Sequence, residues 1–187
     1  MTAASTLARP PARPSPAPQH DPQPRLWTVD EFHLMGEHGF FEGRGAKLMN
    51  GVVIEEGPMN PPHAVAGEKT EDVIRAAFGA GWRVRVQKPL VLGQTTDPEP
   101  DVAVVRGAPA LGPHPTTADL VIEISDTSLK FDTTEKLALY ATAGIADYWV
   151  LDVNARRLHV FRDPAGDAYA TRLTFGEAEA VAPLAAP

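Results

Sequence analysis

The sequence predicts an α/β protein in which a central mixed β-sheet is flanked by helices. Helix-like and strand-like segments alternate along the chain, and the last third is mostly strand-like. The 187 residues include no cysteine, which excludes disulfides, Cys-rich zinc sites and thiol nucleophiles. We expect one domain over residues 25–175, a disordered Pro/Ala-rich tail over 1–24 and a C-terminal tail over 176–187.

A short helix and a β-hairpin come first. Thr28 and Glu31 have the spacing of a capping box, which predicts a helix immediately after them. Asn50 and Gly51 then separate two apolar runs. Because this dipeptide tolerates the positive φ angles of a two-residue type I′ turn, we expect a hairpin around it.

A longer helix and several strands follow. Residues 63–78 have apolar side chains at helical spacing and end before a glycine. Asp132 and Glu135 form a second N-terminal capping pattern, which predicts a helix that ends at Gly144. The predicted strands are residues 82–86, 100–105, 119–124, 148–153 and 157–161, with a weaker one at 169–173.

The charge and hydropathy of the chain limit its partners. Seventeen basic and 24 acidic residues give a net charge of −7, so any contact with nucleic acid must be local. No run of 18 apolar residues and no secretory signal occurs, and we therefore expect a cytoplasmic protein with no membrane partner. Two basic sets could contact nucleic acid, although surface ion pairs explain either as well: Arg83, Arg85 and Lys88, and Arg156, Arg157 and Arg162.

Two carboxylates lie at predicted strands. Glu123 is inside an otherwise apolar strand, and Asp101 directly precedes another. Two such charges about 4 Å apart repel by roughly 4 kcal/mol at an effective dielectric near 20. If the two strands are neighbours, the carboxylates converge and a divalent cation would relieve the repulsion. The alternative for each acid is a turn cap or an ion pair with a surface arginine.

These residues resemble a known nuclease pattern. Pro100-Asp101 followed by Glu123-Ile124-Ser125 resembles the PD-(D/E)xK motif, with Ser125 where lysine is usual. The wider run, over about residues 28–162, resembles the Uma-type family of restriction-endonuclease-like proteins, in which the lysine stands in the following helix, here as Lys136. Further matching motifs are Leu48-Met49-Asn50-Gly51, Pro62-His63 and Tyr148-Trp149-Val150-Leu151-Asp152.

The resemblance implies a restriction-endonuclease-like core and a metal-dependent endonuclease acting on DNA. Asp101 and Glu123 would bind Mg²⁺ or Mn²⁺, with the backbone carbonyl of Ile124 as a third ligand. The ion would polarise a phosphodiester and activate water. Lys136 would orient that water or stabilise developing charge. Without the family pattern, the expected interpretation of Lys136 is a solvent-exposed helix lysine.

Four further residues are weighed as site neighbours. His63 could carry a proton or contact phosphate, and a structural histidine is the equal alternative. Gln87 shares the strand parity of the two preceding arginines and is a candidate polar neighbour of the site. Asp132 is favoured as a helix N-cap over a metal ligand. Tyr140, one turn after the lysine, is favoured as core packing.

The chain departs from the family pattern at the hairpin. The family usually has Glu ahead of the turn and Asp within it, whereas this chain has Lys47 and Asn50. The main alternative is therefore an impaired nuclease-fold module that binds nucleic acid or a protein partner; hydrolysis of another phosphate ester is a third. Trp149, Phe161 and Phe175 fit either the core or the seam of a homo-oligomer, so the sequence leaves the oligomeric state open.

Overall fold

A six-stranded mixed sheet lies at the centre of the computed structural model, which describes residues 22–109 and 111–186. Its strands, in spatial order, are β3 (Trp82–Val86), β4 (Val102–Arg106), β5 (Leu120–Ser125), β6 (Asp147–Asp152), β7 (Arg157–Ala165) and β8 (Ala168–Phe175). Strands β5 and β6 run parallel, and the other neighbouring pairs of this sheet run antiparallel. The predicted α/β class with a mixed sheet is confirmed.

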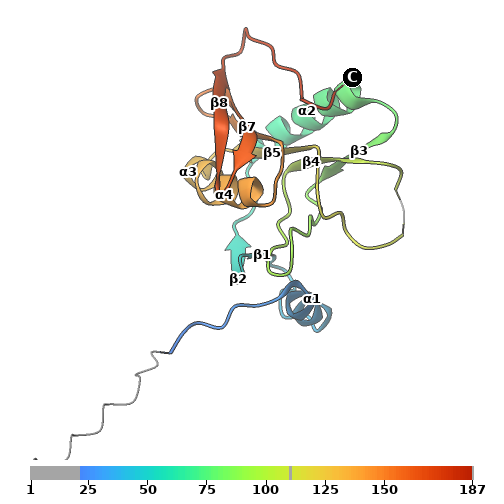
Figure 1. The fold of residues 1–187 in the computed structure, drawn as a ribbon, viewed down its shortest axis with the longest axis vertical. Coiled ribbons are helices and arrows are strands. Elements are labelled where there is room, and N and C mark those ends of the chain that lie inside the picture. Colours follow the sequence, from blue (N-terminus) through green and yellow to red (C-terminus); the bar gives the residue numbers. More distant parts are fainter. Residues whose placement is uncertain (1–21, 110, 187) are drawn as a thin grey trace, which may run out of the picture.

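Helices cover both faces of this sheet (Figure 1). The helices are α1 (Val29–Glu37), α2 (Pro61–Phe78), α3 (Leu129–Thr133) and α4 (Glu135–Thr142). Helix α2 lies on one face, and α3 and α4 lie on the other. The predicted capping box of Thr28 and Glu31 is present at α1. Helix α2 begins two residues before the predicted start because prolines are tolerated in a first turn, where the missing N–H needs no partner.

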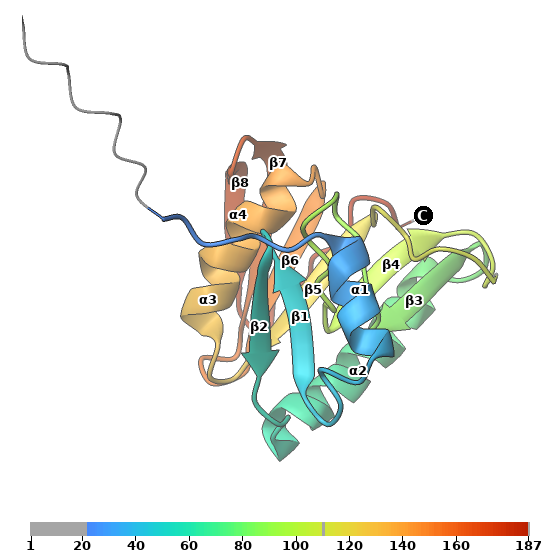
Figure 2. The same cartoon turned by 90° about the horizontal axis from the view of Figure 1, so that it is seen from below.

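A separate two-stranded sheet consists of β1 (Gly45–Met49) and β2 (Val52–Glu56). Asn50 and Gly51 connect them with φ angles of 50° and 78°, as the predicted two-residue turn requires. A bridge between Leu48 and Asp97 joins β1 to the loop before β4. Figure 2 shows β2 beside α3 and α4, so the hairpin forms a wall next to the main sheet.

The helix predicted to begin at Asp132 differs in the structure. Asp132 lies inside α3, its side chain is buried, and it caps neither helix. Thr134 separates α3 from α4 with φ −124° and ψ −79°, outside the helical region. The N-cap interpretation of Asp132 is therefore wrong: its carboxylate binds groups of the buried interior instead.

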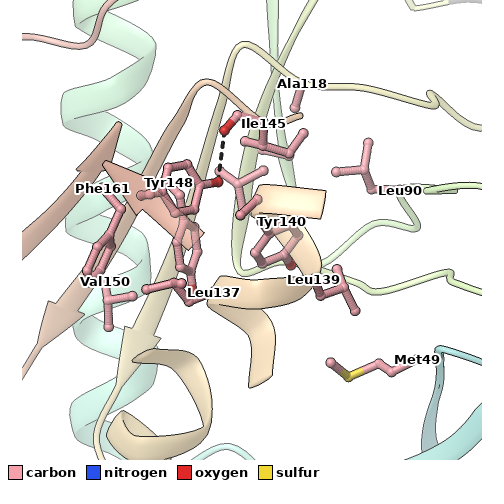
Figure 3. Close-up of a cluster of buried hydrophobic side chains, with 14 of the residues drawn as sticks. Met49, Leu90, Ala118, Leu137, Leu139, Tyr140, Ile145, Tyr148, Val150 and Phe161 are labelled. Carbon is pink, nitrogen blue, oxygen red and sulfur yellow. Dashed lines mark hydrogen bonds between the residues drawn. The ribbon is translucent and has the colours of Figure 1, made fainter. Parts of the chain in front are cut away.

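Apolar side chains fill both sides of the main sheet. Ile74 and Phe78 of α2 pack on one face, in a cluster that also contains Trp149. On the other face, Tyr140 and Tyr148 lie side by side with ring centroids 4.9 Å apart (Figure 3). Phe161 is buried in this second cluster. Glu123 follows Val121 at a spacing of two and so points toward the α4 face, into a largely apolar layer.

The two ends of the chain differ in what the structure describes. Residues 1–21, most of the predicted N-terminal tail, lie outside the described residues. After β8 the described chain continues without a helix or strand, but Val181 and Ala185 pack against the core and the Leu184 N–H donates to Asp147 at 2.8 Å. None of the helices in the described ranges combines the length and apolar character needed to span a membrane.

Candidate active site

Asp101 and Glu123 come together because β4 and β5 are antiparallel neighbours. Val102 pairs with Ile122, and the same register, continued by one residue, sets Asp101 opposite Glu123. Directly opposite residues of an antiparallel pair project to the same face. The strands thus bring two carboxylates to one corner of the sheet, on the side of α4.

Two donors from different elements hold Asp101. Its Oδ2 accepts the backbone N–H of Ile124 at 2.8 Å, and its Oδ1 lies 3.0 Å from Nε2 of His63 in the first turn of α2. Burial raises the pKa of Asp101, but these hydrogen bonds outweigh it, so the pKa stays below its usual range. The hydrogen bond to Asp101 raises the pKa of His63 above 6.5. The pair is therefore biased toward a carboxylate facing an imidazolium.

Asn60 fixes where that imidazole stands. Its side chain accepts the backbone N–H of His63 at 3.1 Å, which caps α2. Its amide nitrogen also donates to Asp126, in the turn after β5. The start of α2 is thereby tied to the end of the strand that carries Glu123, and His63 is kept beside Asp101.

Glu123 is almost fully buried and has a donor on each oxygen. Its Oε1 accepts the hydroxyl of Tyr140 at 2.7 Å, and its Oε2 accepts Nζ of Lys136 at 3.0 Å. Burial raises the pKa of Glu123 to about 7, although the nearby lysine opposes this shift. Tyr140 does pack in the core as predicted, but the sequence analysis missed its contact with Glu123. The spacing of four residues to Lys136, which places both on one helix face, was the available signal.

Lys136 lies among three carboxylates. Its Nζ is 3.0 Å from Glu123, 3.2 Å from Asp132 and 3.6 Å from Glu56. Its side chain is only 7% exposed, which contradicts the alternative of a solvated helix lysine. Burial lowers the pKa of Lys136, but the three acids outweigh this effect and raise it. The group is therefore a permanent cation within an acidic cluster.

Asp132 holds this lysine from the adjacent turn. One oxygen accepts the hydroxyls of Ser125 and Ser128, and the other faces Lys136. The backbone carbonyl of Asp132 accepts the hydroxyl of Tyr148 at 2.7 Å. Ser125, which stands where the nuclease pattern has lysine, is thus linked to Lys136 through Asp132.

Glu56 links the hairpin to this cluster, and the sequence analysis did not single it out. Its Oε2 bonds Nζ of Lys47, and its Oε1 is the third acidic neighbour of Lys136. Lys47 also donates to the backbone carbonyl of Glu99 at 3.2 Å. Lys47 pairs across the hairpin with Ile54, so Glu56, two residues on, is its diagonal neighbour on the same face. That register could have identified the pair.

A cavity of about 570 Å³ opens onto Asp101, His63, Lys136 and the Lys47–Glu56 pair, while Glu123 lies buried behind its lining. Its size is in the range of ligand sites in proteins. Gln87 reaches the cavity directly after β3, where its N–H contacts the carbonyls of Pro100 and Asp101 at 3.2 Å. The charged or polar lining residues used below are Lys47, Glu56, His63, Gln87, Glu99, Asp101 and Lys136.

The predicted nucleic-acid contacts do not meet at this cavity. Arg156 and Arg157 line a different cavity, beside α2 and Trp149. Arg85 donates to the backbone carbonyl of Pro89 at 3.0 Å. Arg83 lines a third hollow, Arg162 pairs with Asp147, and Lys88 is exposed on the surface. Among the described residues, neither Lys88 nor any arginine lines the cavity that holds Asp101.

The donors of the cluster fit a hard divalent cation in type and in charge. Four carboxylates, of Glu56, Asp101, Glu123 and Asp132, lie among two ammonium groups and the His63 imidazole, so that with Glu123 ionised and His63 protonated one negative charge remains in excess. Carboxylate and backbone carbonyl oxygens suit Mg²⁺, which usually takes one or two carboxylates and completes its shell with water or phosphate. Among the described residues, no three His, Asp or Glu side chains are grouped as a ready-made metal cage.

Comparisons with known proteins agree with this fold. The model of the Uma2 family, described as "Putative restriction endonuclease", matches residues 29–187. A crystal structure of "a putative nuclease belonging to DUF820" from Anabaena variabilis ATCC 29413 is similar with a TM-score of 0.59 and 17% sequence identity, over 74% of this chain and 80% of that one. At this identity the likeness shows the fold alone. No curated protein matches the chain.

Proposed function

The chain belongs to the Uma2 family, and from that premise we propose that it is a metal-dependent endonuclease that hydrolyses phosphodiester bonds of DNA. The observation that carries the proposal is the meeting of Asp101 and Glu123 on adjacent strands, with Lys136 buried against Glu123 and a cavity open to both Asp101 and the lysine. The carboxylate oxygens and the excess of negative charge around them support the binding of a divalent cation.

Asp101, Glu123 and the backbone carbonyl of Ile124 would hold Mg²⁺ or Mn²⁺. When bound, the ion would polarise the phosphodiester and lower the pKa of a water. Lys136 offsets the cost of burying Glu123 and fixes the direction of its carboxylate. His63 orients Asp101 through its Nε2 and would supply a proton to a leaving oxygen in the cavity.

The second candidate function is a nuclease-fold module that binds nucleic acid or a protein partner without cutting. One observation favours it: both oxygens of Glu123 already have donors, Tyr140 and Lys136, so an ion must share them. Carboxylate oxygens can accept more than one partner, and for this reason we place the enzyme first.

A plasmid-nicking assay with Mg²⁺ or Mn²⁺ separates the two candidates. We expect the wild type to nick DNA and both Asp101→Asn and Glu123→Gln to lose roughly 100-fold or more of that rate. Asp72→Asn, which removes an exposed carboxylate of α2, is the matched control and should nick as the wild type does. Binding without nicking by the wild type would establish the module. Nicking that survives both site variants would contradict the proposed site.

A further inference from the structure

The two lysines of the cavity have different electrostatic surroundings. Three carboxylates lie within 3.6 Å of Lys136 Nζ. In the described ranges, Lys47 has one carboxylate at ion-pair distance, that of Glu56, and its second contact is an uncharged carbonyl. The positive charge of Lys136 is thus outnumbered locally, whereas that of Lys47 is balanced by one partner.

This difference decides which lysine an anion can reach. A phosphate that approaches Lys136 also approaches the buried carboxylates of Glu123 and Asp132, and like charges at such distances repel strongly. Glu56 lies beside both lysines and does not distinguish them. An ammonium group has three N–H donors, and the two contacts of Lys47 leave one for a ligand. His63 is the other basic group of the cavity, and its Nε2 is already bound to Asp101.

The partner of Lys47 is also the more adaptable one. Glu56 is 35% exposed, while Glu123 and Asp132 are at most 2% exposed. A carboxylate near the surface can turn toward water when a phosphate arrives, whereas the buried pair cannot leave its donors without a desolvation cost. Lys47 can therefore exchange part of its ion pair for a substrate contact.

We propose that Lys47 contacts a backbone phosphate of the DNA, which replaces part of the ion pair of Lys47 with Glu56. This inference rests on the proposed function and gives the cavity its substrate-binding cation. It also gives a role to the lysine that stands where the family pattern has glutamate. The hairpin then serves as the wall along which the DNA backbone lies, next to Asp101.

Oligonucleotide binding at several salt concentrations tests the proposal. Each phosphate contact contributes about 0.9 to the slope of log affinity against log salt for duplex DNA. We expect Lys47→Met to reduce that slope by about 1 and, in the nicking assay, to raise KM much more than it lowers kcat. Lys47→Arg should keep the slope. The matched control is Lys69→Met, which removes an exposed lysine of α2 that lines the other cavity.

The outcomes separate this inference from the proposed function. If Lys47→Met folds and binds with the slope of the wild type while Asp101→Asn abolishes nicking, the phosphate role of Lys47 is wrong and the nuclease stands. If Lys47→Glu nicks faster than the wild type, the lysine is an impairment and the proposal is overturned. A wild type that neither binds nor cuts DNA overturns both. Thermal melting of every variant identifies a loss that comes from misfolding.

Discussion

Replacing Lys136 with methionine tests whether the acidic cluster depends on this one cation. The variant keeps the length of the aliphatic stem but removes the charge that Glu123, Asp132 and Glu56 face at 3.0 to 3.6 Å. Removing one partner of a buried ion pair typically costs about 3–5 kcal/mol. A domain of this kind is stable by only about 5–15 kcal/mol in total, so we expect a large drop in the free energy of unfolding at pH 8.

The stability lost in Lys136→Met should depend on pH, because the substitution changes the pKa of Glu123. The pKa of Glu123 in the folded protein is already raised, from 4.5 to about 7, by burial. A carboxyl group with a raised folded pKa contributes stability that is present below its unfolded pKa and lost as the pH rises through the folded value. Without Lys136 that pKa rises further. The deficit of Lys136→Met should therefore be larger at pH 8 than at pH 5.

Urea unfolding followed by tryptophan fluorescence at pH 5, 6, 7 and 8 measures this deficit. Lys130→Met is the matched control, because Lys130 is an exposed lysine of the neighbouring helix α3, and it should stay within about 0.5 kcal/mol of the wild type. The reasoning is refuted if Lys136→Met costs less than about 1 kcal/mol at pH 8, or if its cost does not change with pH.

Three further predictions concern the metal, the buried hydroxyl and the core. Millimolar Mg²⁺ or Mn²⁺ should raise the melting temperature of the wild type, because an ion that binds the folded state stabilises it. Asp101→Ala and Glu123→Ala should each abolish that shift. A shift retained in both variants would place the ion elsewhere. Tyr140→Phe should destabilise the protein by about 1–3 kcal/mol in urea unfolding, since it leaves a buried oxygen of Glu123 without its donor; a neutral effect would mean that water replaces the hydroxyl. Phe78→Ala, at a side chain only 2% exposed in the α2 face of the core, should cost about 3–5 kcal/mol, and a loss below about 1 kcal/mol would contradict its packing role.

Local signals predicted the elements well because their causes are local. The hairpin follows from Asn50 and Gly51, whose positive φ angles are a property of the dipeptide and its neighbours. The capping box of α1 likewise needs only Thr28 and Glu31. The alternation within strands correctly set Glu123 on the face opposite to Ile122 and Ile124.

Which side chains meet at the site depends on how distant segments pack, and no single segment of the sequence contains that information. From the sequence, the convergence of Asp101 and Glu123 was conditional on their strands being neighbours. The antiparallel pairing of β4 and β5 meets that condition. Asp132 looked like a helix cap because the same residue type serves both at helix starts and in buried networks. Glu56 was missed because its contact with Lys136 requires the hairpin to pack beside α4, a packing that leaves no periodic trace in the chain.

The clustered residues are translated in an order that leaves the buried lysine until late. A ribosome exposes Lys47, Glu56, Asp101 and Glu123 well before Lys136, whose helix follows the strand of Glu123. Until α4 has emerged, Glu123 lacks the lysine against which it is buried, whereas Glu56 can already pair with Lys47 and Asp101 with His63. Chains truncated before α4 therefore lack Lys136 and also strands β6 to β8, so that their main sheet is incomplete and Glu123 has no buried cation beside it.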